Sequence, residues 1–73
     1  MSKYEGEPIT QDMFRCLVQD ALEFVFSHRI ASILNVHENK VYEWADGVNL
    51  PTGPSLGMYY AKLQCHEFWD EFF

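Results

Sequence analysis

Histidine and cysteine, two residue types that often do chemistry, occur five times in the chain without a useful spacing. The histidines are His28, His37 and His66, and the cysteines are Cys16 and Cys65. A structural zinc site needs about four ligands in close-set pairs, and Cys–His catalysis needs a third group that orients the histidine. Only Cys65 and His66 are neighbours. We therefore expect no metal, no cofactor and no enzymatic activity, and we expect buried or half-buried thiols rather than a disulfide.

A second group of reactive side chains lies in the segment HENKVYEWAD, residues 37–46. It carries three carboxylates, those of Glu38, Glu43 and Asp46, against a single lysine. Carboxylates suit a basic peptide or an arginine-rich protein surface, where they contribute steering and register. Tyr42 is an aromatic side chain able to anchor such a contact. We therefore predict a partner-binding face that consists of Glu38, Tyr42, Glu43 and Asp46.

Residues suited to nucleic acid are few. Asn39 has the groups to read adenine, Lys40 those to meet guanine or phosphate, and Arg29 and Arg15 are the other basic residues placed to help. The chain holds 11 acidic against 5 basic residues, for a net charge of -6. DNA affinity depends on cations that displace counterions, and an acidic protein repels a polyanion. These four residues are therefore expected near nucleic acid only within a larger complex.

The composition favours one small folded domain. Seventy-three residues leave no room for a second core, and a hydrophobic content of 48% is too high for a disordered chain. No apolar run approaches the roughly 20 residues that cross a bilayer. The N-terminus lacks the layout of a signal peptide. These features predict a cytoplasmic protein without a membrane segment.

Apolar residues recur at helical spacing in four segments, and no segment alternates as a strand does. The predicted helices cover about 11–26, 28–34, from after Val36 to Asp46, and 55–66, with Thr52 or Ser55 as the cap of the last. The fold class is therefore all-α, a compact bundle of about four helices. We expect a flexible N-terminal arm over residues 1–9 and a single domain over residues 10–66.

The chain ends in an acidic-aromatic tail, residues 67–73. Its large aromatic residues are Phe68, Trp69, Phe72 and Phe73. Four exposed aromatic side chains would promote aggregation, so we expect them to fold back over the first and fourth helices. The alternative is a peptide that docks into a partner or dimerises.

The second and third predicted helices resemble the helix-turn-helix of phage repressors of the λ-repressor and Cro type. That motif has a small residue on its first helix, a turn residue with positive φ, inward-facing residues on its second helix, and a glycine stop. The matching residues are Ala31, Asn35, Val36, Val41, Trp44, Gly47 and Pro51. Asparagine stands where glycine is usual, at a modest cost in strain. The resemblance covers about residues 28–51 and implies a helix-turn-helix within the bundle.

Length, acidity and these residues together also resemble the small RNA polymerase-binding antitermination proteins of lytic phages that infect Xanthomonas. The resemblance implies a non-catalytic regulator in the cytoplasm of an infected bacterial host. Such a regulator binds the large subunits of host RNA polymerase, inhibits host-type initiation or suppresses intrinsic termination, and takes no small-molecule substrate. Two alternatives stay open. One is a Cro-like dimeric repressor that reads an operator with Arg29, Asn39 and Lys40, and the other is an acidic inhibitor of another host nucleic-acid-binding complex.

Overall fold

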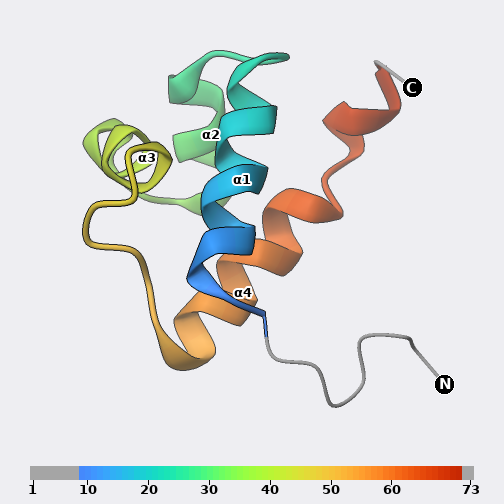
Figure 1. The fold of residues 1–73 in the computed structure, drawn as a ribbon. Coiled ribbons are helices and arrows are strands. Elements are labelled where there is room, and N and C mark those ends of the chain that lie inside the picture. Colours follow the sequence, from blue (N-terminus) through green and yellow to red (C-terminus); the bar gives the residue numbers. More distant parts are fainter. Residues whose placement is uncertain (1–8, 72–73) are drawn as a thin grey trace, which may run out of the picture.

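The computed structural model describes residues 9–71, which form four α-helices and one 3-10 helix (Figure 1). The helices are α1 (Gln11–Leu22), α2 (Ser27–Leu34), α3 (Glu38–Ala45) and α4 (Gly53–Gln64), followed by the 3-10 helix η1 (Glu67–Glu71). Residues 9–71 contain no strand, so the predicted all-α bundle is confirmed. The arm predicted over residues 1–9 lies, apart from Ile9, outside the described residues. Ile9 packs against the core.

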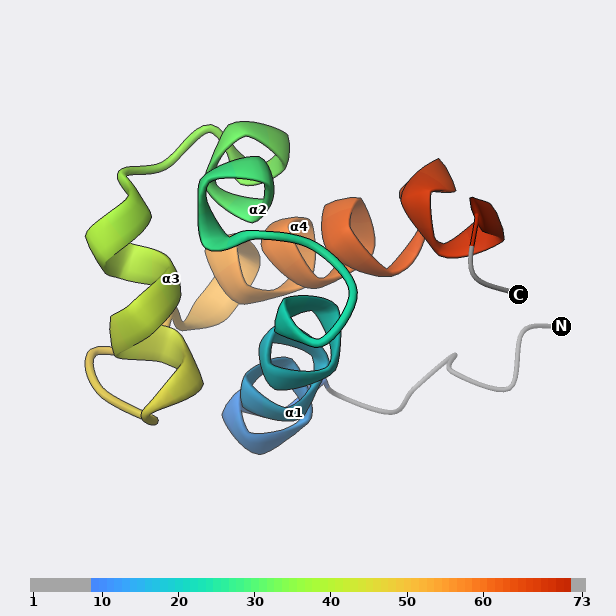
Figure 2. The same cartoon turned by 90° about the horizontal axis from the view of Figure 1, so that it is seen from above.

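Helix α1 packs against α2, α3 and α4, and the core lies between these helices. Seen from above, α3 lies at one edge of the bundle and η1 at the opposite end of the molecule (Figure 2). The outer side of α3 therefore faces away from the other helices. The buried apolar side chains that fill the core are Phe14, Val18, Ala21, Val25, Ile30, Ala31, Leu34, Val41, Trp44, Leu56, Leu63 and Phe68.

Helix α1 is shorter than its apolar spacing predicts, because it ends at Leu22 and not near residue 26. The backbone N–H groups of Phe24 and Val25 both donate to the carbonyl of Ala21, which closes a turn in place of another helical turn. Val25 stays buried after this turn. Its burial continues the apolar pattern beyond the helix, and Phe26, with extended backbone, begins the approach to α2.

The connection from α2 to α3 depends on Asn35. Its φ of 57° and ψ of 48° place it in the left-handed region, as the sequence predicts. The N–H of Val36 donates to the carbonyl of Ala31 at 3.0 Å, which caps α2. Because Ala31 is small and buried, the two backbones can approach closely. Helix α3 then begins at Glu38.

The inner side of α3 carries Val41 and Trp44, both buried as predicted. The indole N–H of Trp44 donates to the carbonyl of Asn49 at 3.1 Å, so the loop after α3 satisfies the polar atom of a core side chain. Gly47 ends this segment with a φ of 78°. These are the local features on which the helix-turn-helix resemblance depends, and the relationship to phage repressors itself stays a prediction.

Helix α4 begins earlier than predicted, at Gly53 rather than Ser55, with Thr52 at its N-cap. Pro54 therefore lies in the first helical turn and not in the loop. Proline is accepted there because the first turn needs no hydrogen bond from its backbone nitrogen. The loop between α3 and α4 is correspondingly shorter than the prolines and glycines suggest.

The tail folds back onto the domain over its described part. Phe68 is fully buried. The indole N–H of Trp69 donates to the carbonyl of Leu63 at 2.7 Å, and its ring meets that of Phe24 edge-on, with centroids 5.6 Å apart. The prediction is confirmed for Phe68 and Trp69, and Phe72 and Phe73 lie outside the described residues.

Replacing Phe68 with alanine tests the contribution of the tail to the core. We expect Phe68→Ala to lower the free energy of unfolding by about 3 kcal/mol, because it removes a buried ring and leaves a cavity. Urea unfolding measures the change. Met58→Ala, at a half-exposed position on α4, is the control and should change stability by less than about 0.5 kcal/mol. Equal effects of the two changes would contradict a structural role for the tail.

The turn at Asn35 gives a second test. Asn35→Ala places a Cβ without a helping polar group in the left-handed region, so stability should fall by about 1 kcal/mol. Asn35→Gly carries no such penalty and should leave stability unchanged within about 0.5 kcal/mol. Both values come from thermal or urea unfolding. Alanine tolerated as well as glycine would show that the backbone conformation at residue 35 is not a constraint.

Candidate functional site

The histidines have local structural partners. The Nδ1 atom of His37 accepts the backbone N–H of Asn39 at 3.1 Å and so caps α3. The same atom of His66 accepts the N–H of Phe68 at 3.1 Å and so holds the start of η1. Among residues 9–71, no group of three or more His, Cys, Asp or Glu side chains is placed to hold a metal ion. His37 and His66 therefore shape helix ends.

The expectation of buried or half-buried thiols is wrong. Cys16 and Cys65 are both free and exposed. Cys16 lies beside the apolar stripe of α1, and Cys65 is the C-cap residue of α4. The apolar character of the cysteine side chain therefore did not predict its burial at these two positions, which are both on the outside of the bundle.

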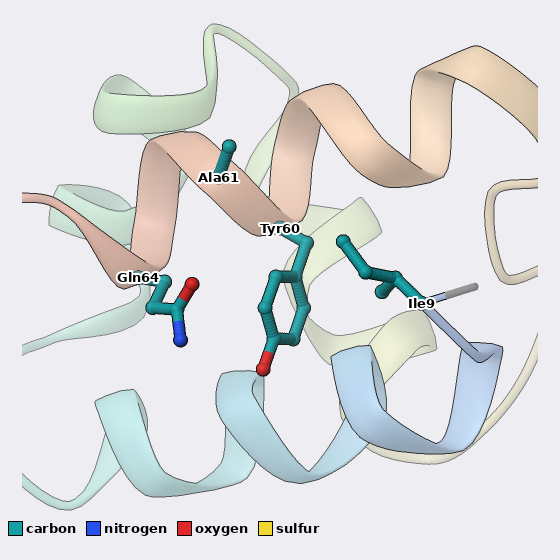
Figure 3. Close-up of a pocket in the computed structure, with 4 residues that line it drawn as sticks. All are labelled: Ile9, Tyr60, Ala61 and Gln64. Carbon is teal, nitrogen blue, oxygen red and sulfur yellow. The ribbon is translucent and has the colours of Figure 1, made fainter. Parts of the chain in front are cut away.

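A shallow apolar hollow lies between α4 and the start of α1 (Figure 3). It is lined by Ile9, Tyr60, Ala61 and Gln64, and the ring of Tyr60 points toward α1. Catalytic pockets need several convergent polar or titratable groups. This hollow is lined mainly by carbon, so it does not have the composition of a catalytic centre.

The outer side of α3 carries the predicted partner-binding residues. Successive helical residues are about 100° apart, so Tyr42 and Asp46 point away from the buried pair on the inner side. Both are exposed, and Tyr42 is 53% exposed, as expected for an aromatic anchor. Glu43 and Glu38 are partly exposed on the two flanks of this surface. We call the surface formed by Glu38, Tyr42, Glu43 and Asp46 the α3 face.

Two of these residues are held by a side chain from α2. The Ser27 hydroxyl is nearly buried and contacts both the Glu38 carboxylate and the Tyr42 hydroxyl, the latter at 2.7 Å. An ionised carboxylate only accepts hydrogen bonds, so the single Ser27 proton goes to Glu38. The Tyr42 O–H must then donate to Ser27. A directed chain of two hydrogen bonds thus runs from Tyr42 through Ser27 to Glu38.

Glu43 has two partners of its own. Lys40 approaches its Oε1 atom at 3.7 Å, and the Asn49 amide donates to the same atom at 3.4 Å. The lysine that the sequence offers for nucleic acid is therefore partly neutralised by a neighbouring acid. Asn49 has a φ of 50° and also accepts from the core tryptophan, so the loop supports the α3 face from one side.

The other residues expected near nucleic acid lie on three different elements. Arg15 is on α1 and donates to Asp12 through both Nε, at 3.1 Å, and a terminal nitrogen. This hydrogen bonding and the charge of Asp12 raise the pKa of Arg15 above its usual value, so the guanidinium stays protonated. Arg29 is exposed in the first turn of α2, and Asn39 is exposed on α3. These residues therefore come from three different helices, and Arg15 and Lys40 are each paired with an acid.

Sequence reasoning missed Ser27 and its neighbour Phe26. Phe26 is 78% exposed, and its ring stacks on that of His28 with centroids 5.8 Å apart. The predicted extension of the first helix to residue 26 concealed this exposure. Serine before a helix is usually an N-cap residue, whereas Ser27 is already the first residue of α2. No local signal indicates that its hydroxyl reaches α3.

Comparisons with models of protein families, with curated proteins and with solved structures find no match to the chain. The helices within residues 9–71 are all too short or too polar to cross a membrane. The α3 face itself therefore gives the main indication of function.

A double-mutant cycle tests the link between the two helices. We expect Ser27→Ala and Tyr42→Phe together to cost less than the sum of the single changes, with a coupling free energy of about 1 kcal/mol. Urea unfolding of the four proteins measures this value. The pair of Met58→Ala and Tyr42→Phe, with no shared contact, should be additive. Additivity of Ser27→Ala with Tyr42→Phe would contradict the hydrogen bond.

Proposed function

We propose that this chain is a non-catalytic phage transcription regulator that binds host RNA polymerase through the α3 face. It acts in the cytoplasm of an infected bacterium, where it inhibits host-type initiation or suppresses intrinsic termination. The observation that carries the proposal is the character of the α3 face. It has an exposed aromatic anchor among three carboxylates, on the helix that corresponds to the DNA-reading helix in the resemblance to phage repressors.

The charges support a protein partner over DNA. A repressor needs cations at the phosphates for affinity and donors at base edges for specificity. Around α3, Lys40 is engaged by Glu43, and on α1 Arg15 is engaged by Asp12. The exposed Tyr42 and Asp46 add no positive charge. Exposed carboxylates favour a basic protein surface, toward which they steer the encounter.

The choice of RNA polymerase among basic partners comes from the resemblance to small antitermination proteins. The nucleic acid in such a complex is already held by the polymerase. Arg15, Arg29, Asn39 and Lys40 can then contribute weak contacts, because the effective concentration of the nucleic acid is high. The same residues do not suffice for a repressor that must find DNA alone.

Charge reversal on the α3 face tests the proposal. We expect the double variant Glu43→Lys and Asp46→Lys to weaken binding to purified host RNA polymerase by about tenfold or more, because like charges across an interface cost several kcal/mol. The matched control, Asp20→Lys with Glu67→Lys, makes the same change in net charge at exposed positions on α1 and η1. The control should bind within about threefold of the original chain, a difference of less than 1 kcal/mol.

The same preparation separates the alternatives. Transcription with purified polymerase should show less initiation at host-type promoters or more read-through at an intrinsic terminator. A chain that binds a DNA duplex tightly near physiological salt, with a steep salt dependence, would instead be a repressor. If tagged protein captures no polymerase subunit from host lysate, the proposal is wrong.

A further inference from the structure

The surface beside Ser27 has a hydrogen-bonding character that the charges alone do not reveal. The Tyr42 proton is committed to Ser27, so the phenol oxygen presents only acceptor positions to the solvent. The Glu38 carboxylate uses one of about four lone-pair positions for Ser27 and keeps the others. A partner group that meets these two side chains must therefore supply protons. Donor-rich cations satisfy this requirement best.

An exposed aromatic ring belongs to the residue just before Ser27, the N-cap residue of α2. Phe26 directly precedes Ser27. Among the large hydrophobic side chains of residues 9–71, that of Phe26 has the greatest exposure, at 78%. The ring stacks on His28, with planes 13° apart, which fixes it at the start of α2. The face of an aromatic ring carries partial negative charge and attracts cations. The start of α2 thus carries an exposed ring, and the first two turns of α3 carry the acceptors that contact Ser27, also at the start of α2.

We infer that Phe26, Glu38 and Tyr42 form a binding site for an arginine side chain of a protein partner, with Ser27 as the positioning residue. The planar guanidinium can stack on a ring while it donates several hydrogen bonds in a fixed geometry. Lysine offers a compact charge that stacks less well. The inference rests on the proposed function in one respect, since it extends the α3 face onto α2 and names the side chain that the face receives.

The net charge of the chain favours a basic protein over a second copy of the chain as the partner at this site. The chain has a net charge of -6, so two copies repel each other. Two such surfaces would also bring acceptors against acceptors. A partner with exposed arginine supplies both the missing charge and the missing donors.

Short synthetic peptides test the site without the polymerase. The probe is a pentapeptide with two arginines between glycines, and its matched controls carry lysine or the neutral isostere citrulline. NMR titration of the whole chain at near-physiological salt should move the amide signals of residues 26–28, Glu38 and Tyr42. We expect the lysine peptide to bind about two- to fivefold more weakly, and citrulline to produce no saturable shift.

Variants identify the contribution of each group. Phe26→Leu keeps an apolar side chain but removes the ring, so arginine-peptide affinity should fall about two- to fivefold, whereas Phe26→Tyr should retain it. Glu38→Gln should also weaken binding, and Asp20→Asn, an exposed acid on α1, should not. Ser27→Ala should weaken binding although Ser27 itself is nearly buried. Each variant is first checked for the helical circular dichroism of the original chain.

Three results would overturn the inference. These are equal affinity for the arginine and lysine peptides, shifts as large at the acids of α1 and η1 as at the site, or unchanged binding by Phe26→Leu. Peptide binding at the site together with failure to capture polymerase would support the inference and contradict the proposed function. Polymerase binding that responds to charge reversal at Glu43 and Asp46, but not to Phe26→Leu or Glu38→Gln, would overturn the inference alone.

Discussion

Three aromatic rings from three different helices meet in the core and set the orientation of α3. Phe14 of α1 is fully buried and meets the edge of Trp44 with centroids 5.3 Å apart. Tyr59 of α4 approaches Trp44 at 5.2 Å and Phe14 at 6.5 Å. Because Trp44 is held on two sides, α3 cannot rotate without opening the core. The side opposite Trp44 is therefore presented to solvent, and the position of every candidate site residue on α3 follows from this packing.

Two acids on the outer side of α3, Glu43 and Asp46, are compatible with this packing because they play little part in it. Exposed ion pairs such as that of Lys40 and Glu43 contribute little to stability, typically less than about 1 kcal/mol. The buried side chains do not depend on the charge at these two positions. A small helical bundle can therefore carry different surface charges on the same fold, which is why fold and function are separate questions for this chain.

Ser27 connects the stability of the domain to the properties of its surface. Its hydroxyl joins α2 to two residues of α3 that are separated by one helical turn. The hydrogen bonds that hold the helices in register also leave Tyr42 and Glu38 as acceptors toward solvent. A partner that supplies donors there would meet side chains that are already oriented, and it would lose less conformational entropy on binding than with free surface residues.

The sequence by itself determined the features that depend on local backbone preference and on helical periodicity. These include the four helices, the left-handed turn at Asn35, the stop at Gly47 and the inward position of Trp44. Only the tertiary structure decided where α1 ends, because Val25 is buried by a turn that mimics the helical pattern. It also decided the partners of Ser27, which lie 11 and 15 residues away. The periodicity of apolar residues indicates which side chains are buried. It does not indicate which distant polar group will form a hydrogen bond with a buried hydroxyl.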